Sequence, residues 1–331
     1  MAEVSIIIPV YNNVKYVEKC IRSVMQQTLQ DLEIIVINDG STDGSYEILQ
    51  KLEKEDRRIS LLTQKNSGVA AARNHGLRTA SGKYITFVDG DDYLQVDYIE
   101  KMYQAAEKEQ LDMVICGLTY VDESGKELSK VVPGVYKRYE NEEWTFRISG
   151  VWCHLYRRAL WQQYDIEFIS GERGEDMPVS LFFSAMCERI NTIPECGYFY
   201  VQYAESAMHN FKGLKRYSLP YRGLENTILK VQENGIKNSP EFYELFVLRI
   251  FSTFLFQLAP GASKEKMKEL TQYIWRILYQ YFPGYYKNTK ARLTAKVEIP
   301  FVQKAAVKVL IMLVRTKLLY TFGEVFSKKQ D

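Results

Sequence analysis

Short apolar runs alternate with amphipathic stretches over the first 116 residues of the chain. The apolar runs are rich in β-branched residues and predict buried strands at residues 4–8, 33–38, 59–63, 83–88 and 113–116. Between them, apolar residues recur with the helical period at residues 14–29, 45–57, 67–80 and 97–110. Helices that connect successive strands are typical of a largely parallel sheet with helices on both faces. The pattern therefore predicts an α/β fold.

The pattern changes along the rest of the chain. Residues 117–210 show no clear period apart from a helix predicted at residues 178–187. Beyond residue 212 the helical period dominates, and breaks that contain Pro separate helices predicted at residues 219–234, 240–258, 264–281 and 300–326. We therefore expect two domains, an α/β domain over residues 1–210 and a helical region over residues 211–331.

The charge distribution supports a division near residue 210. The 331 residues carry a net charge of only +2. Residues 1–210 hold 22 Lys and Arg against 32 Asp and Glu, a net charge of −10, whereas residues 211–331 hold 21 against 9, a net charge of +12. The two parts are therefore expected to meet different partners. The composition, 46% apolar and 25% charged, excludes a disordered chain.

The cysteines and the apolar runs bear on location. The five cysteines are scattered and form no Cys-x-x-Cys pair, which favours buried free thiols in a reducing compartment. The apolar run at residues 4–10 is too short for a signal peptide and lacks the preceding basic residues. No segment approaches the roughly 18 apolar residues of a membrane span. We expect a cytoplasmic protein.

An acidic loop follows the strand predicted at residues 83–88. Residues 89–92 read DGDD, and three carboxylates this close repel one another unless a cation binds. Carboxylate oxygens suit Mg²⁺ or Mn²⁺, with phosphate oxygens completing the shell. A solvated turn is the alternative, because Asp and Gly are common turn formers. Tyr11, Asn12 and Asp39 also follow predicted strands, and ligands of parallel sheets bind at such strand ends, which favours the cation site.

Other candidate groups have two interpretations each. Asp39 can accept hydrogen bonds from a base or a ribose, or it can belong to an ordinary turn. The small residues from Gly68 onward leave room for a ligand but equally suit close packing of a helix, while Arg73 could reach a phosphate or a base. Glu175 and Asp176 near a helix start favour a helix cap over a general base from spacing alone.

Taken together, these motifs resemble the bacterial family 2 glycosyltransferases. The resemblance covers about residues 3–205, and the motifs occur in the family's order and spacing. It rests on VSIIIPVYN at residues 4–12, EIIVINDGSTD at 33–43, NSG at 66–68, ARN at 72–74, FVDGDD at 87–92 and GED at 174–176. It implies the GT-A fold, a Rossmann-like and mostly parallel sheet with helices on both faces, here followed by an α-helical C-terminal region.

The resemblance also implies roles for the residues at the nucleotide. Pro9, Tyr11 and Asn12 would line the pocket of the base, and Asp39 would hydrogen-bond the base, which we expect to be uracil. Gly68 and Arg73 would lie at the nucleotide as well.

The remaining roles that the resemblance implies concern the metal and the acceptor. Asp89 would contact the ribose or the metal, and Asp91 would hold the metal, a divalent Mn²⁺ or Mg²⁺. Asp176 would be the catalytic base, with Glu175 as the second choice. Some family members supply a late His to the metal, so His209 is a further candidate ligand, although a surface position is the simpler interpretation.

The activity that follows is an inverting transfer of a hexosyl unit from a nucleotide sugar, expected to be a UDP-sugar, to an acceptor hydroxyl. The acceptor would be a glycan or a lipid-linked glycan in the synthesis of a bacterial surface polysaccharide (capsule, O-antigen or exopolysaccharide). A non-catalytic nucleotide-sugar-binding or scaffold subunit of an assembly complex is the alternative. A sugar-1-phosphate nucleotidyltransferase is disfavoured because residues 9–12 lack its Gly-rich basic loop, and no motif indicates nucleic-acid binding.

The last predicted helix carries a basic stripe. Lys304, Lys308 and Arg315 lie within about 40° of one another on a helical wheel at about 100° per residue, and Lys317 breaks the pattern. Such a helix either packs on a domain or lies on an anionic membrane surface. Because the resembling family often uses lipid-linked acceptors, we expect residues 300–326 to contact a membrane, which would place the protein peripherally on its inner face.

Overall fold

The structure, a computed structural model, describes residues 2–133, 150–203, 214, 218–297 and 299–328. The chain forms two compact units. The first unit comprises Met1–Trp144, Gly150–Gly171 and Cys187–Ser206, and the second comprises Thr145–Ser149, Glu172–Met186 and Ala207–Asp331. The segment from Glu172 to Met186 therefore groups with the C-terminal helices, and the domain boundary at residue 210 stays a prediction.

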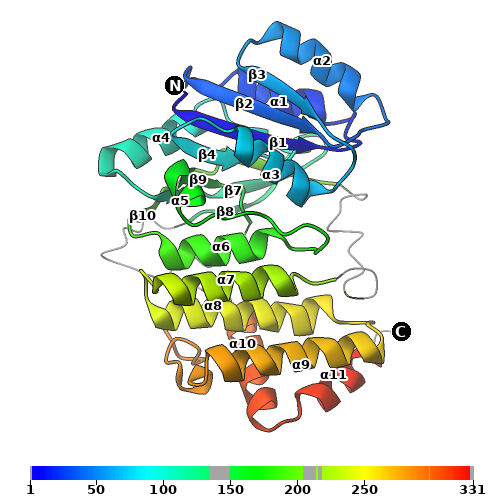
Figure 1. Cartoon of the computed structure of the whole chain (residues 1–331), viewed down its shortest axis with the longest axis vertical. Helices are drawn as coiled ribbons and strands as arrows, with labels where there is room; N and C mark the ends of the chain where they lie inside the picture. Colours follow the sequence, from blue (N-terminus) through cyan, green and yellow to red (C-terminus); the bar gives the residue numbers. More distant parts are fainter. Residues whose placement is uncertain (1, 134–149, 204–213, 215–217, 298, 329–331) are drawn as a thin grey trace. The chain divides into compact units, whose positions relative to one another are not determined.

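A seven-stranded sheet forms the centre of the first unit (Figure 1). Its order is β10 (Ile190–Thr192), β6 (Met113–Ile115), β9 (His154–Arg157), β4 (Tyr84–Phe87), β1 (Val4–Val10), β2 (Leu32–Asn38) and β3 (Ile59–Thr63). Only β9 runs antiparallel to its neighbours; the remaining pairs within the sheet are parallel. The predicted mostly parallel α/β sheet is therefore confirmed.

The helices of this unit connect the strands in two directions. They are α1 (Val17–Met25), α2 (Ser45–Glu55), α3 (Val69–Thr79) and α4 (Tyr98–Glu109). From β1 the chain moves outward through α1 and α2 to β3, and then returns through α3 to β4 on the other side of β1. The helix α3 packs on one face, where Gly76 lies against Ile7. The helices α1 and α4 lie on the other face, where the N–H of Ile99 on α4 donates to the side chain of Gln27, just after α1, and Tyr84 of β4 donates to Glu107 of α4. The strand order reverses between β1 and β4, which is where open α/β sheets bind ligands.

Two details of these elements bear on the sequence prediction. The first strand does not end at Pro9 but continues to Val10, because β4 pairs with β1 only as far as Ile7 and the missing N–H of Pro9 breaks no ladder on that side. Further along α3, Gly76 packs closely on the sheet, where an added Cβ would lie 2.4 Å from the Ile7 side chain, whereas a Cβ added at Gly68 would meet nothing within 4 Å, so both interpretations of the small residues stay open.

A second, four-stranded sheet takes three of its strands from the region that showed no clear period. Its order is β5 (Tyr93–Leu94), β11 (Tyr198–Gln202), β7 (Leu118–Asp122) and β8 (Glu127–Val131). The strand β5 directly follows the acidic loop at residues 89–92, and it pairs antiparallel with β11. This sheet therefore brings β11 next to the acidic loop, although about 100 residues separate them in sequence.

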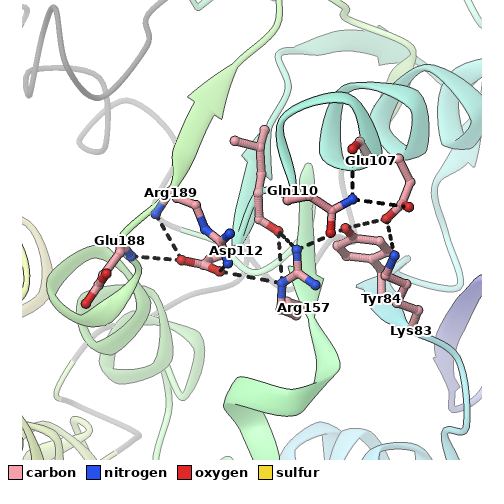
Figure 2. Close-up of polar contacts among 9 residues, drawn as sticks. Lys83, Tyr84, Glu107, Gln110, Asp112, Arg157, Glu188 and Arg189 are labelled. Carbon is pink, nitrogen blue, oxygen red and sulfur yellow. Dashed lines mark hydrogen bonds and ion pairs between the residues drawn. The ribbon is translucent and has the colours of Figure 1, made fainter.

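A polar network fixes the antiparallel strand β9 and the start of β10 (Figure 2). The Asp112 carboxylate accepts the backbone N–H groups of Glu188 and Arg189 at 3.0 and 2.9 Å. The Arg157 guanidinium donates to the carbonyl of Leu111 at 2.8 Å and lies 3.5 Å from Asp112. Several hydrogen bonds to a buried carboxylate offset the free-energy cost of removing it from water. The network therefore joins β6, β9 and β10 at one end of the sheet.

The second unit is helical. It contains α6 (Asp176–Met186), α7 (Tyr221–Asn234), α8 (Pro240–Thr253), α9 (Lys264–Tyr281), α10 (Phe301–Arg315) and α11 (Leu319–Lys328). A π-helical turn at Phe254–Leu258 extends α8 as far as the sequence predicted. No helix in the described residues is long and apolar enough to cross a membrane.

The single helix predicted at residues 300–326 is wrong, because the chain breaks between α10 and α11. Lys317 has φ +60°, and its N–H donates to the Val314 carbonyl while the Leu318 N–H donates to the Leu313 carbonyl. These two hydrogen bonds form a Schellman motif, which ends a helix. The five cysteines are free, and four of them are buried, as expected.

Candidate functional site

The loops after β1 and β4 meet at the point where the strand order reverses. Gly90 follows β4, and a Cβ added there would lie 3.1 Å from both the Pro9 carbonyl oxygen and the Asn13 side chain. The thiol of Cys20 on α1 lies 3.5 Å from the carbonyl oxygen of Asp89. The close approach explains the glycine within the acidic loop. The predicted site residues on these two loops therefore lie at one edge of the sheet.

The β1–α1 loop is fixed by the turn that follows β2. Asn12 has φ +46°, a left-handed conformation that Asn tolerates better than most residues. Its side-chain oxygen accepts the N–H of Thr42 at 2.7 Å, and its own N–H donates to the Ser41 hydroxyl at 3.1 Å. Tyr11 is 50% exposed beside it. An exposed aromatic ring on a fixed loop can stack on a planar base.

The buried Asp39 carboxylate accepts three hydrogen bonds from a neighbouring segment. The donors are the Gln64 amide at 2.8 Å, the Ser67 N–H at 2.9 Å and the Gly68 N–H at 2.8 Å. Gly68 precedes α3 and has φ +87° and ψ +162°, a conformation open essentially to glycine alone. The N-terminal N–H groups of a helix have no partner within the helix. Asp39 therefore anchors the start of α3 to the end of β2.

Arg73 and Asp89 contact each other. The buried Arg73 guanidinium on α3 donates to the Asp89 carboxylate at 2.8 Å and lies 5.4 Å from the centre of the Phe168 ring. Asn74 holds the backbone of Phe168 through a reciprocal pair of hydrogen bonds at 2.7 and 2.8 Å. The family resemblance assigned Arg73 to the nucleotide and Asp89 to the ribose or the metal, and the structure in addition pairs them. Arg73 therefore places a positive charge at the first carboxylate of the acidic loop.

Two tyrosines, both missed by the sequence analysis, hold the other carboxylates of the acidic loop. The Tyr198 hydroxyl donates to Asp92 at 2.7 Å and accepts the N–H of Asp89 at 3.2 Å, while the Val201 N–H donates to Asp92 at 2.9 Å. The Tyr203 hydroxyl donates to Asp91 at 2.7 Å. Both tyrosines come from the second sheet or directly after it. The consecutive aromatic residues at 198–200 were the signal of this strand in the sequence.

The acidic loop is electrostatically strained. Burial raises the pKa of the Asp92 carboxyl well above its usual range, and the charges of Asp91 and Asp89 raise it further. Burial, followed by the charge of Asp89, also raises the pKa of Asp91. The donors to Asp91 and Asp92 from side chains are neutral phenols, so they supply hydrogen bonds without a compensating positive charge. The loop would therefore gain from a bound cation.

The donor set fits a cation that a nucleotide diphosphate helps to hold. In the described part of the chain, no three His, Cys, Asp or Glu side chains form a group that could hold a metal ion by themselves. Mg²⁺-type sites commonly use one or two carboxylates together with substrate phosphates. Because Asp92 is committed to β11 and Asp89 to Arg73, Asp91 is the carboxylate best suited to such a site.

The predicted catalytic base lies in the second unit. Asp176 is the first residue of α6, directly after Glu175 and Gly174, which has φ +82°. The preceding Glu172 accepts the N–H groups of Arg222 and Gly223 at 3.0 and 3.1 Å, and so caps the start of α7. The loop before Asp176 is therefore anchored within its own unit. His209 lies outside the described residues, so its role stays a prediction.

Comparison with known proteins places the chain in a family. The family model described as Glycosyl transferase family 2 matches residues 5–164. The glycosyltransferase GlyG of Streptococcus pneumoniae serotype 4 is 32% identical over 220 residues, which are 62% of this chain and 72% of GlyG. The chain belongs to the family 2 glycosyltransferases. The uncharacterized glycosyltransferase EpsJ of Bacillus subtilis is 39% identical over 209 residues, and the matched part spans 60% of each chain.

A solved structure supports the GT-A fold of this family 2 member over nearly its whole length. TarS of S. aureus, residues 1–349, solved in complex with UDP-GlcNAc, matches with a TM-score of 0.75. The identity is 17%, and the match covers 99% of this chain and 92% of the TarS chain. At this identity the likeness establishes the fold, including the helical C-terminal region.

The family match covers part of the predicted site. Its range of residues 5–164 contains the base-pocket, nucleotide and metal residues from Pro9 to Asp91. Asp176 and Glu175 lie beyond it, as do Tyr198 and Tyr203. The roles of all these residues in this glycosyltransferase stay predictions, although the structure brings together those of the first unit.

We predict that Tyr198→Phe destabilises the first unit by about 1–3 kcal/mol, because the buried Asp92 carboxylate loses its hydroxyl donor. Chemical denaturation of both proteins, followed by tryptophan fluorescence, measures the difference. Tyr200→Phe is the matched control on the same strand, since the Tyr200 hydroxyl makes no hydrogen bond among the described residues. Equal stability of the two variants would contradict the anchoring role of Tyr198.

Proposed function

We propose that this family 2 glycosyltransferase moves a hexosyl unit from a UDP-sugar to an acceptor hydroxyl, with inversion at the anomeric carbon. One observation carries the proposal: Tyr11, Asn12, Arg73, Asp89 and Asp91 meet at the strand-order reversal, beside the anchored Asp39. This edge offers an exposed ring for a base, a cation for phosphate charge and a carboxylate for a metal.

Asp91 would hold the divalent cation, Mn²⁺ or Mg²⁺, with Asp89 beside it. When bound, such a cation stabilises the negative charge that develops on the leaving nucleotide diphosphate. The raised pKa of Asp91 and the neutral donor that it has from Tyr203 support this role, because both indicate a carboxylate without a full countercharge. Arg73 would neutralise part of the charge of the donor.

Asp176 would take the proton from the attacking acceptor hydroxyl, with Glu175 as the second choice. A carboxylate can act as a general base when it lies within hydrogen-bond reach of the hydroxyl in the complex with substrates. Its place at the first turn of α6 puts it at the positive end of the helix dipole, where negatively charged side chains are favoured. The acceptor would be a glycan or lipid-linked glycan of a bacterial surface polysaccharide.

The metal role predicts a loss of cation binding in Asp91→Ala. We expect the Kd of Mn²⁺ in the presence of UDP to rise at least about tenfold, because a direct ligand is removed. Electron paramagnetic resonance of free Mn²⁺ measures it. Asp31→Ala removes the same charge from an exposed position and should leave the Kd unchanged. An unchanged Kd in Asp91→Ala would reject the assignment.

The base role predicts a loss of turnover without loss of donor binding in Asp176→Asn. UDP release from a UDP-sugar hydrolysed with Mn²⁺ should fall about 10²–10⁴-fold, the usual effect of removing a general base. The Kd of UDP, measured by calorimetry, should stay the same. Glu175→Gln is the adjacent control and should keep most of the turnover. If Glu175→Gln alone lost it, Glu175 would be the base.

We also infer that the C-terminal helices contact an anionic membrane surface, which would place the enzyme at the inner face of the membrane. The apolar side of α10 is buried within its own unit at Val307, Leu310 and Val314, so the helix itself does not insert. At its N-terminus, however, Phe301 and Val302 are 69% and 77% exposed, near the exposed Lys308. Exposed apolar groups beside basic ones suit a lipid interface.

The membrane proposal predicts weaker vesicle binding when both exposed apolar residues become Ser. Co-sedimentation of Phe301→Ser/Val302→Ser with phosphatidylglycerol vesicles should fall several-fold, because apolar burial and charge act together in such binding. Leu229→Ser, on an exposed position of α7, is the matched control. Binding of the double variant equal to that of the control would reject the membrane contact.

A further inference from the structure

The Asp39 carboxylate has a limited capacity to accept another hydrogen bond. An ionised carboxylate offers about four acceptor positions, two on each oxygen. In the described structure, Oδ1 accepts from Gln64 and Ser67, and Oδ2 accepts from Gly68. The remaining position belongs to Oδ2. Asp39 is 3% exposed, so a ligand that reaches this oxygen does so through a small opening.

A second residue fixes the orientation of Gln64. The Gln64 side-chain oxygen lies 3.0 Å from Nδ1 of His75 on α3. Because that oxygen can only accept, Nδ1 carries the proton of this hydrogen bond. The amide group of Gln64 is thereby turned with its NH₂ toward Asp39. Gln64 thus fills one acceptor position on the carboxylate, and His75 keeps it there.

We propose that Gln64, positioned by His75, restricts Asp39 to a single N–H donor and thereby selects uracil over guanine as the base of the donor nucleotide. The inference rests on the proposed function, because it assumes that Asp39 meets the base. It assigns the selection to Gln64, a residue that the sequence motifs did not single out.

The edges of the bases explain the selection. Uracil presents one N–H group, at N3, between two carbonyl oxygens, and this donor matches the one open position on Oδ2. Guanine presents two neighbouring donors, N1–H and the N2 amino group, which pair with a carboxylate when both oxygens are open. With Oδ1 filled, one guanine donor would be buried without a partner. Cytosine and adenine carry an unprotonated ring nitrogen, an acceptor, where uracil carries N3–H, and only their amino groups could donate to the carboxylate.

The test replaces Gln64 by Leu, which keeps the volume but opens the second position on Oδ1. Titration calorimetry with UDP and with GDP, in the presence of Mg²⁺, gives the ratio of the two Kd values. The wild-type protein should bind UDP more tightly. In Gln64→Leu, GDP should bind more tightly than before and the preference should fall about tenfold or more, since a hydrogen bond to a charged group is involved.

Matched variants separate selection from general damage. Gln30→Leu removes an exposed Gln whose amide bonds only to nearby backbone carbonyls, and it should keep the wild-type ratio. His75→Ala should shift the ratio in the direction of Gln64→Leu but less far. His75→Asn should restore the ratio, because its amide N–H can replace Nδ1 as the donor to Gln64.

The outcomes distinguish this inference from the proposed function. If the wild type binds UDP with a preference that Gln64→Leu and His75→Ala both leave unchanged, the selection by Gln64 is wrong while the proposed function stands. If the wild type prefers GDP, the inference is likewise wrong. If it binds neither nucleotide, the proposed function fails and the inference fails with it. Should Gln64→Leu not fold, the pair of His75 variants decides.

Discussion

The architecture of the ligand edge depends on one constraint: a carboxylate taken out of water must find donors or countercharge. The sheet collects carboxylates at its strand ends, and each of those described finds its partners on another element. Asp39 accepts hydrogen bonds from backbone N–H groups at the start of α3, and Asp89 accepts one from Arg73, further along that helix. Asp92 accepts a hydrogen bond from Tyr198 of the second sheet. The charges of the site therefore also hold its segments together.

The same constraint leaves the acidic loop incompletely compensated. Arg73 supplies one positive charge to three neighbouring aspartates, and the tyrosines supply hydrogen bonds only. A protein that neutralised this loop fully would have little to gain from a metal. The residual repulsion favours a cation that arrives with a diphosphate, because the phosphate oxygens complete the shell that the protein leaves open. Hydrogen bonds of the fold and a bound metal would thus use the same carboxylates. Tyr203 is the example, because its hydroxyl donates to Asp91, the carboxylate proposed to hold the metal.

The sequence predicted much of the first unit because its strands and helices follow from the pattern of apolar residues within each segment. The apolar runs and helical periods located the strands β1 to β4 and the helices between them, and the strand ends predicted which side chains would gather. What the sequence did not reveal depends on distant pairing. Tyr198 lies more than 100 residues from Asp92, and its hydroxyl gives no periodic signal. Helix period alone likewise missed the break at Lys317, which a left-handed residue and two backbone hydrogen bonds create.

The dual use of Asp39 has a consequence for how its function can be studied. Replacing Asp39 would remove any hydrogen bond to a base and would also free two N–H groups at the start of α3, each of which would need a new partner. Loss of nucleotide binding in such a variant would therefore say little about recognition. Gln64 bonds to the same carboxylate without occupying the N–H groups at the start of α3, and its other side-chain contact is with His75, further along that helix. Replacing Gln64 would free one acceptor position on Asp39 while the hydrogen bonds from Ser67 and Gly68 persist. Base recognition and helix stability can therefore be tested separately at Gln64.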